Sequence, residues 1–453
     1  MYIKQLTLKD FRSFTDLSIS FVDEERSDQP CKTVVFIGNN GAGKTAILDA
    51  LKTNLSWLVA RINNYKGNAT PITDKDIHNG QPAATISLQL QYQQCDYNWQ
   101  LSKTLKGRLR TSESQLNEVS KLANLFREQL TKDENNAALP LIVYYRVERA
   151  VLDIPLRIHT RHSFGQLDGY DNALQKGIDS GRFFEWFRER EDSENEVRSN
   201  EVETNIIKII NEFDMSKGRD ALKATLKQVK ASARDQQLIT VRLAIRNFMD
   251  NFENLRIQRK PRLRMLVDKN GETLDVAQLS QGEKSMMALV GDIARRLAMM
   301  NPALENPLDG FGIVLIDEVD LHLHPNWQRA IVGNLNKTFP NCQFVLTTHS
   351  PIVISESPDL LCYSLNNGKL QKLNNLYGMD VNQVLLQDMD AGIRNADIQQ
   401  AFDNLRDSLQ EGQLVEAKEL LAELEQKIAI DNLELSKAKL LIRRLEAQHA
   451  ANR

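Results

Sequence analysis

The chain has 453 residues with a formal net charge of −3, of which 42% are hydrophobic and 26% charged. These values predict a soluble folded protein of about two or three domains, and they exclude binding of nucleic acid through overall positive charge, although a local basic face stays open. None of the four cysteines forms a C-x-x-C pair, which argues against a zinc ribbon and favours a reducing compartment. With no apolar stretch of membrane-spanning length and no apolar leader, we expect a cytoplasmic protein without a membrane partner.

The first third of the chain alternates between strand and helix patterns. Period-two alternation predicts a hairpin over residues 2–21 and a second one over 83–110. Continuously apolar runs at 32–38 and 139–150 predict strands buried on both faces. Helical periodicity begins at Lys44, and a further helix is expected over residues 112–130, as "SESQLNEVSKLANLFREQL".

The remainder predicts a largely helical stretch followed by more sheet. Residues 171–235 read as helical, and their acidic segment "EREDSENEVRSNEVE" (189–203) is expected to be a solvated face. The segment 253–276 reads as two strands joined by the turn at Asn270-Gly271. Two buried strands follow, "GFGIVLIDEVD" (310–320) and "CQFVLTTHS" (342–350), and from Asp397 a helical hairpin with an apolar stripe reaches the end.

These patterns predict an α/β fold in which two incomplete halves form one sheet. The expected division is an N-terminal part of the head (1–150), a helical insertion (151–235), a C-terminal part of the head (236–395) and a helical tail (396–453).

The segment "GNNGAGKT" fits the phosphate-loop pattern G-x-x-x-x-G-K-[ST] between an apolar strand and an amphipathic helix. Its glycines permit backbone angles that let N–H groups surround phosphate oxygens. Lys44 would reach the β- and γ-phosphates of ATP, and Thr45 would ligate Mg²⁺. The expected nucleotide-binding residues here are Gly38, Asn39, Asn40, Gly41, Ala42, Gly43, Lys44, Thr45 and Ala46.

Acidic and polar residues follow two later buried strands. Asp317 and Glu318 end the strand in "IVLIDEVD", so Asp317 is expected to hold Mg²⁺ and Glu318 to act as the general base for water. His349 ends the strand in "VLTTHS" and is expected to sense the γ-phosphate by a hydrogen bond.

The segment "LSQGE" opens a helix far from the phosphate loop in sequence. Ser280 and Glu283 have the spacing of a capping box, and a helix start of this kind suits an anion. Ser280, Gly282 and Glu283 are therefore candidates for contact with a phosphate group.

Together these motifs resemble the ATP-binding cassette superfamily on its RecF/SMC-like side, with "LSQGE" as the signature. The opening "LTLKDFRSF" is similar to that of RecF-like proteins, which implies that Arg12 and Ser13 lie near the nucleotide. The resemblance also implies that the signature of one subunit contacts ATP bound by another, so that ATP joins two heads in a dimer or larger homo-oligomer. The glutamine of the Q-loop stays unassigned near "YYRVERA", and the D-loop position falls near His322 and His324.

Longer segments such as "IDEVDLHLHPNWQRAIVGNL" and "FPNCQFVLTTHSPIVIS" resemble AAA-type ATPases of bacterial antiphage defence, in particular the Septu ATPase family PtuA. That resemblance implies an ABC-type ATPase head whose partner is a separate HNH endonuclease, with DNA reached through the complex. The chain itself shows no HNH pattern, and the pair His322 and His324 is not expected to bind metal.

Two alternatives stay open. One is a RecF-like ATPase of DNA repair, and the other is a self-contained nuclease of the overcoming-lysogenization-defect type, for which residues after 360 offer no acidic strand-end pattern. The basic segments 103–110 and 256–264 fit either contacts with DNA phosphates or charged protection of strand edges.

Overall fold

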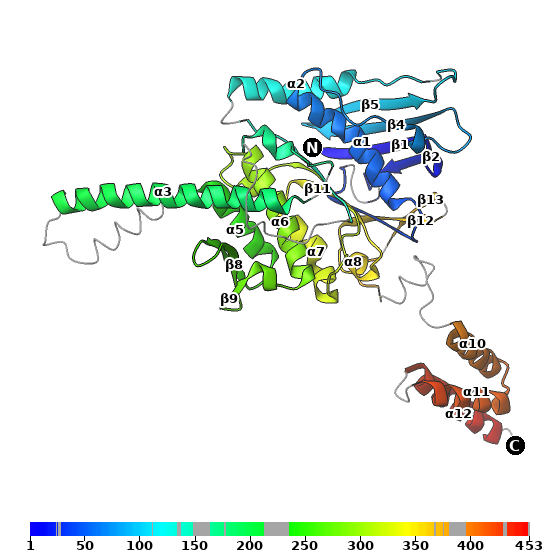
Figure 1. Ribbon diagram of the computed structural model, residues 1–453. Helices are drawn as coiled ribbons and strands as arrows, with labels where there is room; N and C mark the ends of the chain where they lie inside the picture. Colours follow the sequence, from blue (N-terminus) through cyan, green and yellow to red (C-terminus); the bar gives the residue numbers. More distant parts are fainter. Residues whose placement is uncertain are drawn as a thin grey trace. The chain divides into compact units, whose positions relative to one another are not determined.

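The computed structural model divides into two compact units, Met1–Met379 and Asp380–Arg453 (Figure 1). Each unit is considered by itself. The structure describes residues 1–23, 25, 29–110, 112–133, 137–147, 164–175, 178–212, 235–366, 368–374, 376–379, 396–428 and 433–451.

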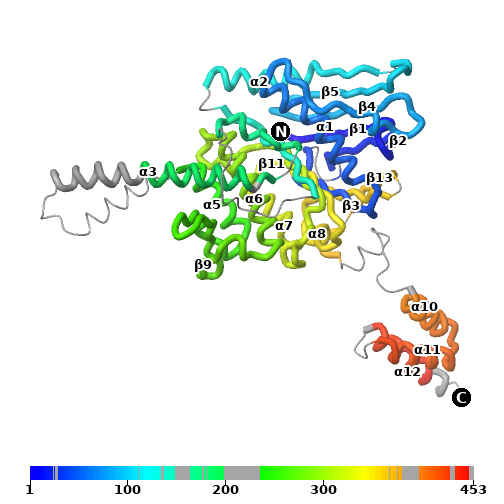
Figure 2. Tube along the Cα trace, in the orientation of Figure 1, coloured from blue at the N-terminus to red at the C-terminus, as the bar shows by residue number. Residues whose placement is uncertain are grey.

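A six-stranded sheet forms the centre of the first unit, in the order β13-β12-β3-β11-β10-β6. All neighbours run parallel except the edge strand β13. Its strands come from both halves of the chain, as the colours in Figure 2 show, which confirms the expected single sheet. The bounds are β3 Thr33–Gly38, β6 Leu141–Tyr145, β10 Gly312–Ile316, β11 Cys342–Thr347, β12 Leu360–Asn366 and β13 Lys369–Leu373.

The four predicted buried strands are confirmed, over shorter spans than the apolar patterns suggested, and residues 148–150 of one pattern lie outside the described residues. Every residue of β3, β6, β10 and β11 is buried, because helices and a second sheet cover both faces. The carboxyl ends of parallel strands meet at one edge, where an α/β sheet places its ligands. That edge therefore brings the phosphate loop after β3 and the acidic residues after β10 together.

A four-stranded antiparallel sheet packs beside the central one, in the order β2-β1-β4-β5. It contains both predicted hairpins, β1 Tyr2–Phe11 with β2 Phe14–Ser20 and β4 Ala83–Tyr92 with β5 Cys95–Thr104. Helix α1 (Lys44–Asn63) contacts β4 of this sheet and β3 of the central sheet. Because it lies between two sheets, α1 is buried over most of its length. Helix α2 (Asn117–Lys132) covers β5.

The segment 253–276 forms three strands, and the prediction of two strands is wrong. Strands β7 (Phe252–Gln258) and β8 (Arg264–Lys269) are separated by the turn that contains Pro261, which has no N–H to donate to a ladder. The expected turn at Asn270-Gly271 then joins β8 to β9 (Glu272–Asp275).

The helical part of the first unit packs around one buried helix. Helix α6 (Gln281–Met300) is buried from Ser285 onward and contacts α5 (Gln236–Phe248) and α3 (Ser180–Glu212). Helices α7 (Pro325–Thr338) and α8 (Pro351–Ser355) complete the unit. The rest of the expected helical stretch, residues 213–234, lies outside the described residues.

The acidic segment of α3 is not simply a solvated face, and this part of the prediction is wrong. Glu191 and Glu194 are each 6% exposed, and both accept hydrogen bonds from Arg242 on α5. Glu191 also accepts from the backbone N–H of Ile257. Burial outweighs these hydrogen bonds and raises the pKa of Glu191 above its ordinary value. The segment thus fastens α3 to its neighbours.

The second unit contains three helices rather than a hairpin of two. Helix α10 (Ala396–Gln410) joins α11 (Leu414–Lys427) and α12 (Leu433–Ala451) around one small core. The predicted apolar stripe supplies much of that core, because Ala417, Leu424 and Leu435 are buried. The difference arises because Phe402 and Leu405 of α10 also point into it.

No helix in the described ranges has both the length and the apolar character needed to cross a membrane.

Candidate nucleotide-binding site

The phosphate loop requires glycine at two positions for steric reasons. Gly38 has φ 145°, and a Cβ atom there would lie 2.2 Å from the carbonyl oxygen of Leu365. Gly43 has φ 109°, and its Cβ would lie 2.6 Å from Phe14. Gly41 also has positive φ, but its Cβ would meet nothing within 4 Å. The loop therefore has no room for a side chain at Gly38 or Gly43, whereas the position of Gly41 between them faces open space.

The side chain of Lys44 folds back over the loop. Its Nζ donates to the carbonyl oxygens of Gly38 at 2.7 Å and Asn39 at 3.1 Å. Burial lowers the pKa of Lys44, although the nearby carboxylates of Asp317 and Glu318 oppose that shift. The lysine is thus held in place before a phosphate arrives, which limits the entropy lost on binding.

A cavity of about 450 Å³ lies along the loop. Ser13 lines it, as the resemblance implied. The guanidinium of Arg12 instead pairs with Asp49 of α1 and with Asp76, at 2.9 Å each. Arg12 therefore anchors the loop after β1 to the helix that carries Thr45. The lining residues are Ser13, Asn39, Asn40, Gly41, Ala42, Asn366 and Gly368.

Asp317 lies between two threonine hydroxyls. Thr45 Oγ1 donates to one carboxylate oxygen at 2.9 Å, and Thr347 Oγ1 donates to the other at 2.5 Å. Two oxygens bound to the same octahedral Mg²⁺ at about 2.1 Å lie about 3 Å apart. The spacing of Thr45 and Asp317 therefore fits Mg²⁺, which would bind both oxygens after the Thr45 hydroxyl hydrogen turns away.

Glu318 follows Asp317 in an unusual backbone conformation. Its φ of 46° lies in the left-handed region, which is uncommon for any residue other than glycine. The N–H of Glu318 donates to Thr347 Oγ1 at 2.8 Å. One hydroxyl of β11 thus positions both acidic residues, and the strained conformation is of the kind found at functional sites.

We predict that Thr347→Val lowers kcat for ATP hydrolysis about 10- to 100-fold and changes KM little. The variant removes a hydrogen bond to a carboxylate, worth about 1.5–3 kcal/mol, and frees Glu318 from its turn. Phosphate release at saturating ATP measures the effect. Thr338→Val is the matched control, because the buried Thr338 hydroxyl has no hydrogen-bond partner in the described structure. Equal activity of Thr347→Val and the parent would remove Thr347 from the account.

The residues after β11 add an arrangement that the motifs did not predict. Thr348 Oγ1 donates to Asp320 at 2.5 Å, which ties the loop after Glu318 to the loop that carries His349. Burial, with the nearby Lys44, lowers the pKa of His349. His349 is therefore neutral near pH 7 and can donate one hydrogen bond to an anion.

The two histidines at the expected D-loop position have structural roles in the described chain. The ring of His324 caps α7, since its Nδ1 accepts from the N–H of Asn326. His322 has φ 61°, and its carbonyl oxygen lies 2.7 Å from where a Cβ of Gly282 would be. The described residues contain no cluster of metal-binding side chains.

The signature segment is built as a capped helix start. Ser280 Oγ accepts from the N–H of Glu283, and Glu283 accepts from the N–H of Ser280. Burial favours the protonated acid, but hydrogen bonds from Lys269 and Ser280 lower the pKa of Glu283 below its ordinary value. None of the residues 279–283 lines the cavity at the phosphate loop. This arrangement is compatible with a signature that serves another subunit.

Much of the positive charge in the predicted basic segments is neutralised within the chain. Arg256 pairs with Asp268 at 3.0 Å, and Arg259 pairs with Asp192 at 2.5 Å. Lys103, in the other segment, lies 3.4 Å from Asp74. These pairings favour the interpretation as charged strand edges over direct contact with DNA phosphates.

Comparison with known proteins identifies the family. A family model described as an AAA ATPase domain matches residues 1–354. The Retron Vc95 probable ATPase of Vibrio cholerae is 35% identical over 374 residues, covering 78% of this chain and 71% of that protein. The Septu protein PtuA of Bacillus mycoides is 46% identical, but over 16% of this chain and 10% of its own length. A solved SMC head bound to the C-winged helix domain of ScpA is 15% identical, covers 82% of this chain and 98% of its own, and has a TM-score of 0.43.

The retron relative matches a far longer share of the chain than the Septu relative does, although the sequence alone pointed first to Septu. The family match spans the phosphate loop, the signature, the acidic strand end and His349. The chain therefore belongs to the AAA ATPase domain family, as an ABC-type ATPase related to those of bacterial antiphage defence.

Proposed function

We propose that this chain is the ATP-binding and ATP-hydrolysing subunit of a Septu-like antiphage-defence complex, in which ATP controls the assembly and activity of an associated HNH endonuclease. The observation that carries the proposal is the position of Asp317 between Thr45 and Thr347. This position supports the proposal because a shared Mg²⁺ would require Thr45 of the phosphate loop and the acidic strand end to lie together.

In the proposed site, Lys44 and the loop N–H groups bind the ATP phosphates. Thr45 and Asp317 would hold Mg²⁺, which supplies charge stabilisation at the phosphates when bound. Glu318 accepts a proton from the attacking water, and His349 donates a hydrogen bond to the γ-phosphate. Ser280, Gly282 and Glu283 of a second copy would complete the site, so that ATP joins at least two heads and hydrolysis releases them.

The proposed complex divides its chemistry between two polypeptides in the cytoplasm. Cutting of DNA needs a metal clamp, and the part of the chain that the structure describes offers candidate magnesium ligands at the ATP site alone, so the proposal assigns the nuclease site to the HNH partner. The insertion near residues 171–235 or the helical tail (396–453) is proposed as the docking surface for that partner, because the nucleotide and the second head would occupy the faces of the ATPase core. DNA would be contacted through the complex.

The test combines a plasmid-cutting assay with light scattering. We expect the purified chain alone to leave plasmid intact with Mg²⁺ or Mn²⁺, and cutting to appear when the proposed HNH endonuclease partner is added. Glu318→Gln should accumulate the ATP-bound assembly, because water attack loses its base. Robust cutting by the chain alone, lost on a substitution outside the ATP motifs, would contradict the proposal and favour a self-contained nuclease.

A further inference from the structure

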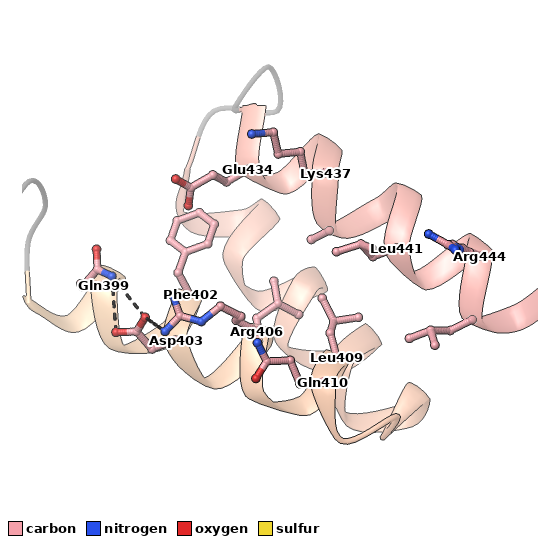
Figure 3. Close-up of a pocket in the computed structure, with 13 residues that line it drawn as sticks. Gln399, Phe402, Asp403, Arg406, Leu409, Gln410, Glu434, Lys437, Leu441 and Arg444 are labelled. Carbon is pink, nitrogen blue, oxygen red and sulfur yellow. Dashed lines mark hydrogen bonds and ion pairs between the residues drawn. The ribbon is translucent and has the colours of Figure 1, made fainter. Parts of the chain in front are cut away.

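The second unit has a groove between α10 and α12, with a volume of about 800 Å³ (Figure 3). Its apolar lining comes from both helices, whereas α11 contributes none of it. The six apolar lining residues are Phe402, Leu405 and Leu409 of α10 and Ala438, Leu441 and Leu445 of α12. Because Phe402, Leu405 and Ala438 also belong to the core of the unit, the floor of the groove is anchored there.

The groove leaves apolar surface in contact with water within this unit. Leu441 lines the groove and is 48% exposed, and the neighbouring Leu440 is 65% exposed. Exposed leucines beside an apolar groove are typical of a site that another protein element covers. The lining residues on each helix span about three turns, so the groove accommodates a short helix.

The charges at the rim indicate what kind of helix fits. On the α10 side, Asp403 is neutralised by Arg406 at 2.7 Å (Figure 3). On the α12 side, Lys437 and Arg444 are seven residues apart and form no ion pair with any described residue. Glu434 also lines the groove, but in the first turn of α12, where a carboxylate offsets the helix dipole. The α12 rim therefore presents two positive charges that suit carboxylates.

The described part of this unit in a second copy is a poor match for the groove. In the described part of this unit, the exposed large hydrophobic residues are Val415, Leu440 and Leu441. Val415 is the only one of these on the described part of α11, so that helix has no exposed apolar stripe to insert. Leu441 already lines the groove, and Leu440 lies outside its lining. The element that binds in the groove must therefore carry its own row of apolar side chains.

We propose that the groove binds an amphipathic helix of a different protein, which places apolar side chains at three- and four-residue spacing between α10 and α12 and carboxylates beside Lys437 and Arg444. This inference is independent of the proposed nucleotide chemistry, because ATP takes no part in it.

The test uses two fluorescein-labelled helical peptides of about 18 residues with the full chain, measured by fluorescence anisotropy. Both carry the same leucine stripe, flanked in one by glutamate and in the other by lysine. We expect the glutamate peptide to bind at least about tenfold more tightly, and Leu441→Asp to weaken its binding about tenfold or more. Leu440→Asp is the matched control on the same helix and should bind like the parent.

The double variant Lys437→Glu/Arg444→Glu keeps the apolar lining and should reverse the preference between the two peptides. Circular dichroism verifies that each variant is folded. The inference is overturned if neither peptide binds, if both bind equally well, or if Leu440→Asp and Leu441→Asp have the same effect. It is also overturned if sedimentation shows that the chain self-associates and that Leu441→Asp abolishes this, because the occupant is then a second copy.

Discussion

Lys44→Ala is expected to abolish ATP binding measured by isothermal titration, with a loss of affinity of about 100-fold or more. Lys44 is 6% exposed, and its ammonium is held at the loop by two carbonyl oxygens, so little conformational freedom is lost when it binds phosphate. Charge-assisted hydrogen bonds of this kind contribute about 3 kcal/mol, and each 1.4 kcal/mol corresponds to about a tenfold change in affinity.

The matched control is Lys121→Ala, which removes an exposed lysine paired with Glu118 on α2. It should bind ATP like the parent, because its ion pair is at the surface. Unchanged ATP affinity in Lys44→Ala, with the control also unchanged, would contradict the assignment of residues 38–45 as the phosphate loop.

Asp292→Ala is expected to destabilise the first unit by about 3–5 kcal/mol, the cost of removing one partner from a buried ion pair. Asp292 of α6 is fully buried and accepts from Arg295 and Arg296, at 2.7 Å each, and from the Tyr145 hydroxyl at 2.9 Å. Its loss leaves two guanidinium groups without their carboxylate. Because Tyr145 is the last residue of β6 and its carbonyl accepts from the N–H of Asp317, the damage reaches the ATP site.

Urea unfolding followed by tryptophan fluorescence measures this effect. All four tryptophans, Trp57, Trp99, Trp186 and Trp327, belong to the first unit, so the signal excludes the tail. Asp96→Ala is the control, because its pair with Lys4 is partly exposed and contributes about 0–1 kcal/mol. A midpoint for Asp292→Ala within the error of the parent would contradict the structural role of this carboxylate.

The pH dependence of the Asp292 contribution has a definite sign. Burial alone would raise its pKa, but Arg296 and Arg295 outweigh burial and lower the pKa of Asp292 to about 2. A carboxyl group whose folded pKa is depressed stabilises the protein above its unfolded pKa of about 3.9. The difference between parent and variant should therefore stay constant from neutral pH to about pH 4 and shrink as the pH falls toward 2.

The sequence was most informative where local pattern and chemistry coincide. The glycines of the phosphate loop, the apolar strands and the capping box at Ser280 each depend on neighbours within a few residues, and the structure has them as predicted. Strands β7 and β8 were predicted as one strand, because their alternating pattern is interrupted only by the short turn that contains Pro261.

The local sequence pattern could not predict contacts between segments that lie far apart along the chain. The hydroxyl of Thr347 bridges two acidic residues about thirty positions away, and Arg12 pairs with Asp49 and Asp76 rather than facing the loop cavity. Glu191 resembled a solvated acid because its partner Arg242 follows only after some fifty residues. Only the sheet order and the helix packing bring these side chains together.

The central claim, that two copies share each ATP site, is tested most directly by mixing two inactive variants. Lys44→Ala lacks the phosphate-loop lysine, and Ser280→Arg places a bulky cation at the signature. In a mixed dimer, one site contains both defects, and the other combines the intact phosphate loop of one copy with the intact signature of the other. The account predicts that each variant alone releases almost no phosphate from ATP and that the mixture recovers measurable ATPase activity. A mixture as inactive as its components, or a fully active Ser280→Arg, would contradict it.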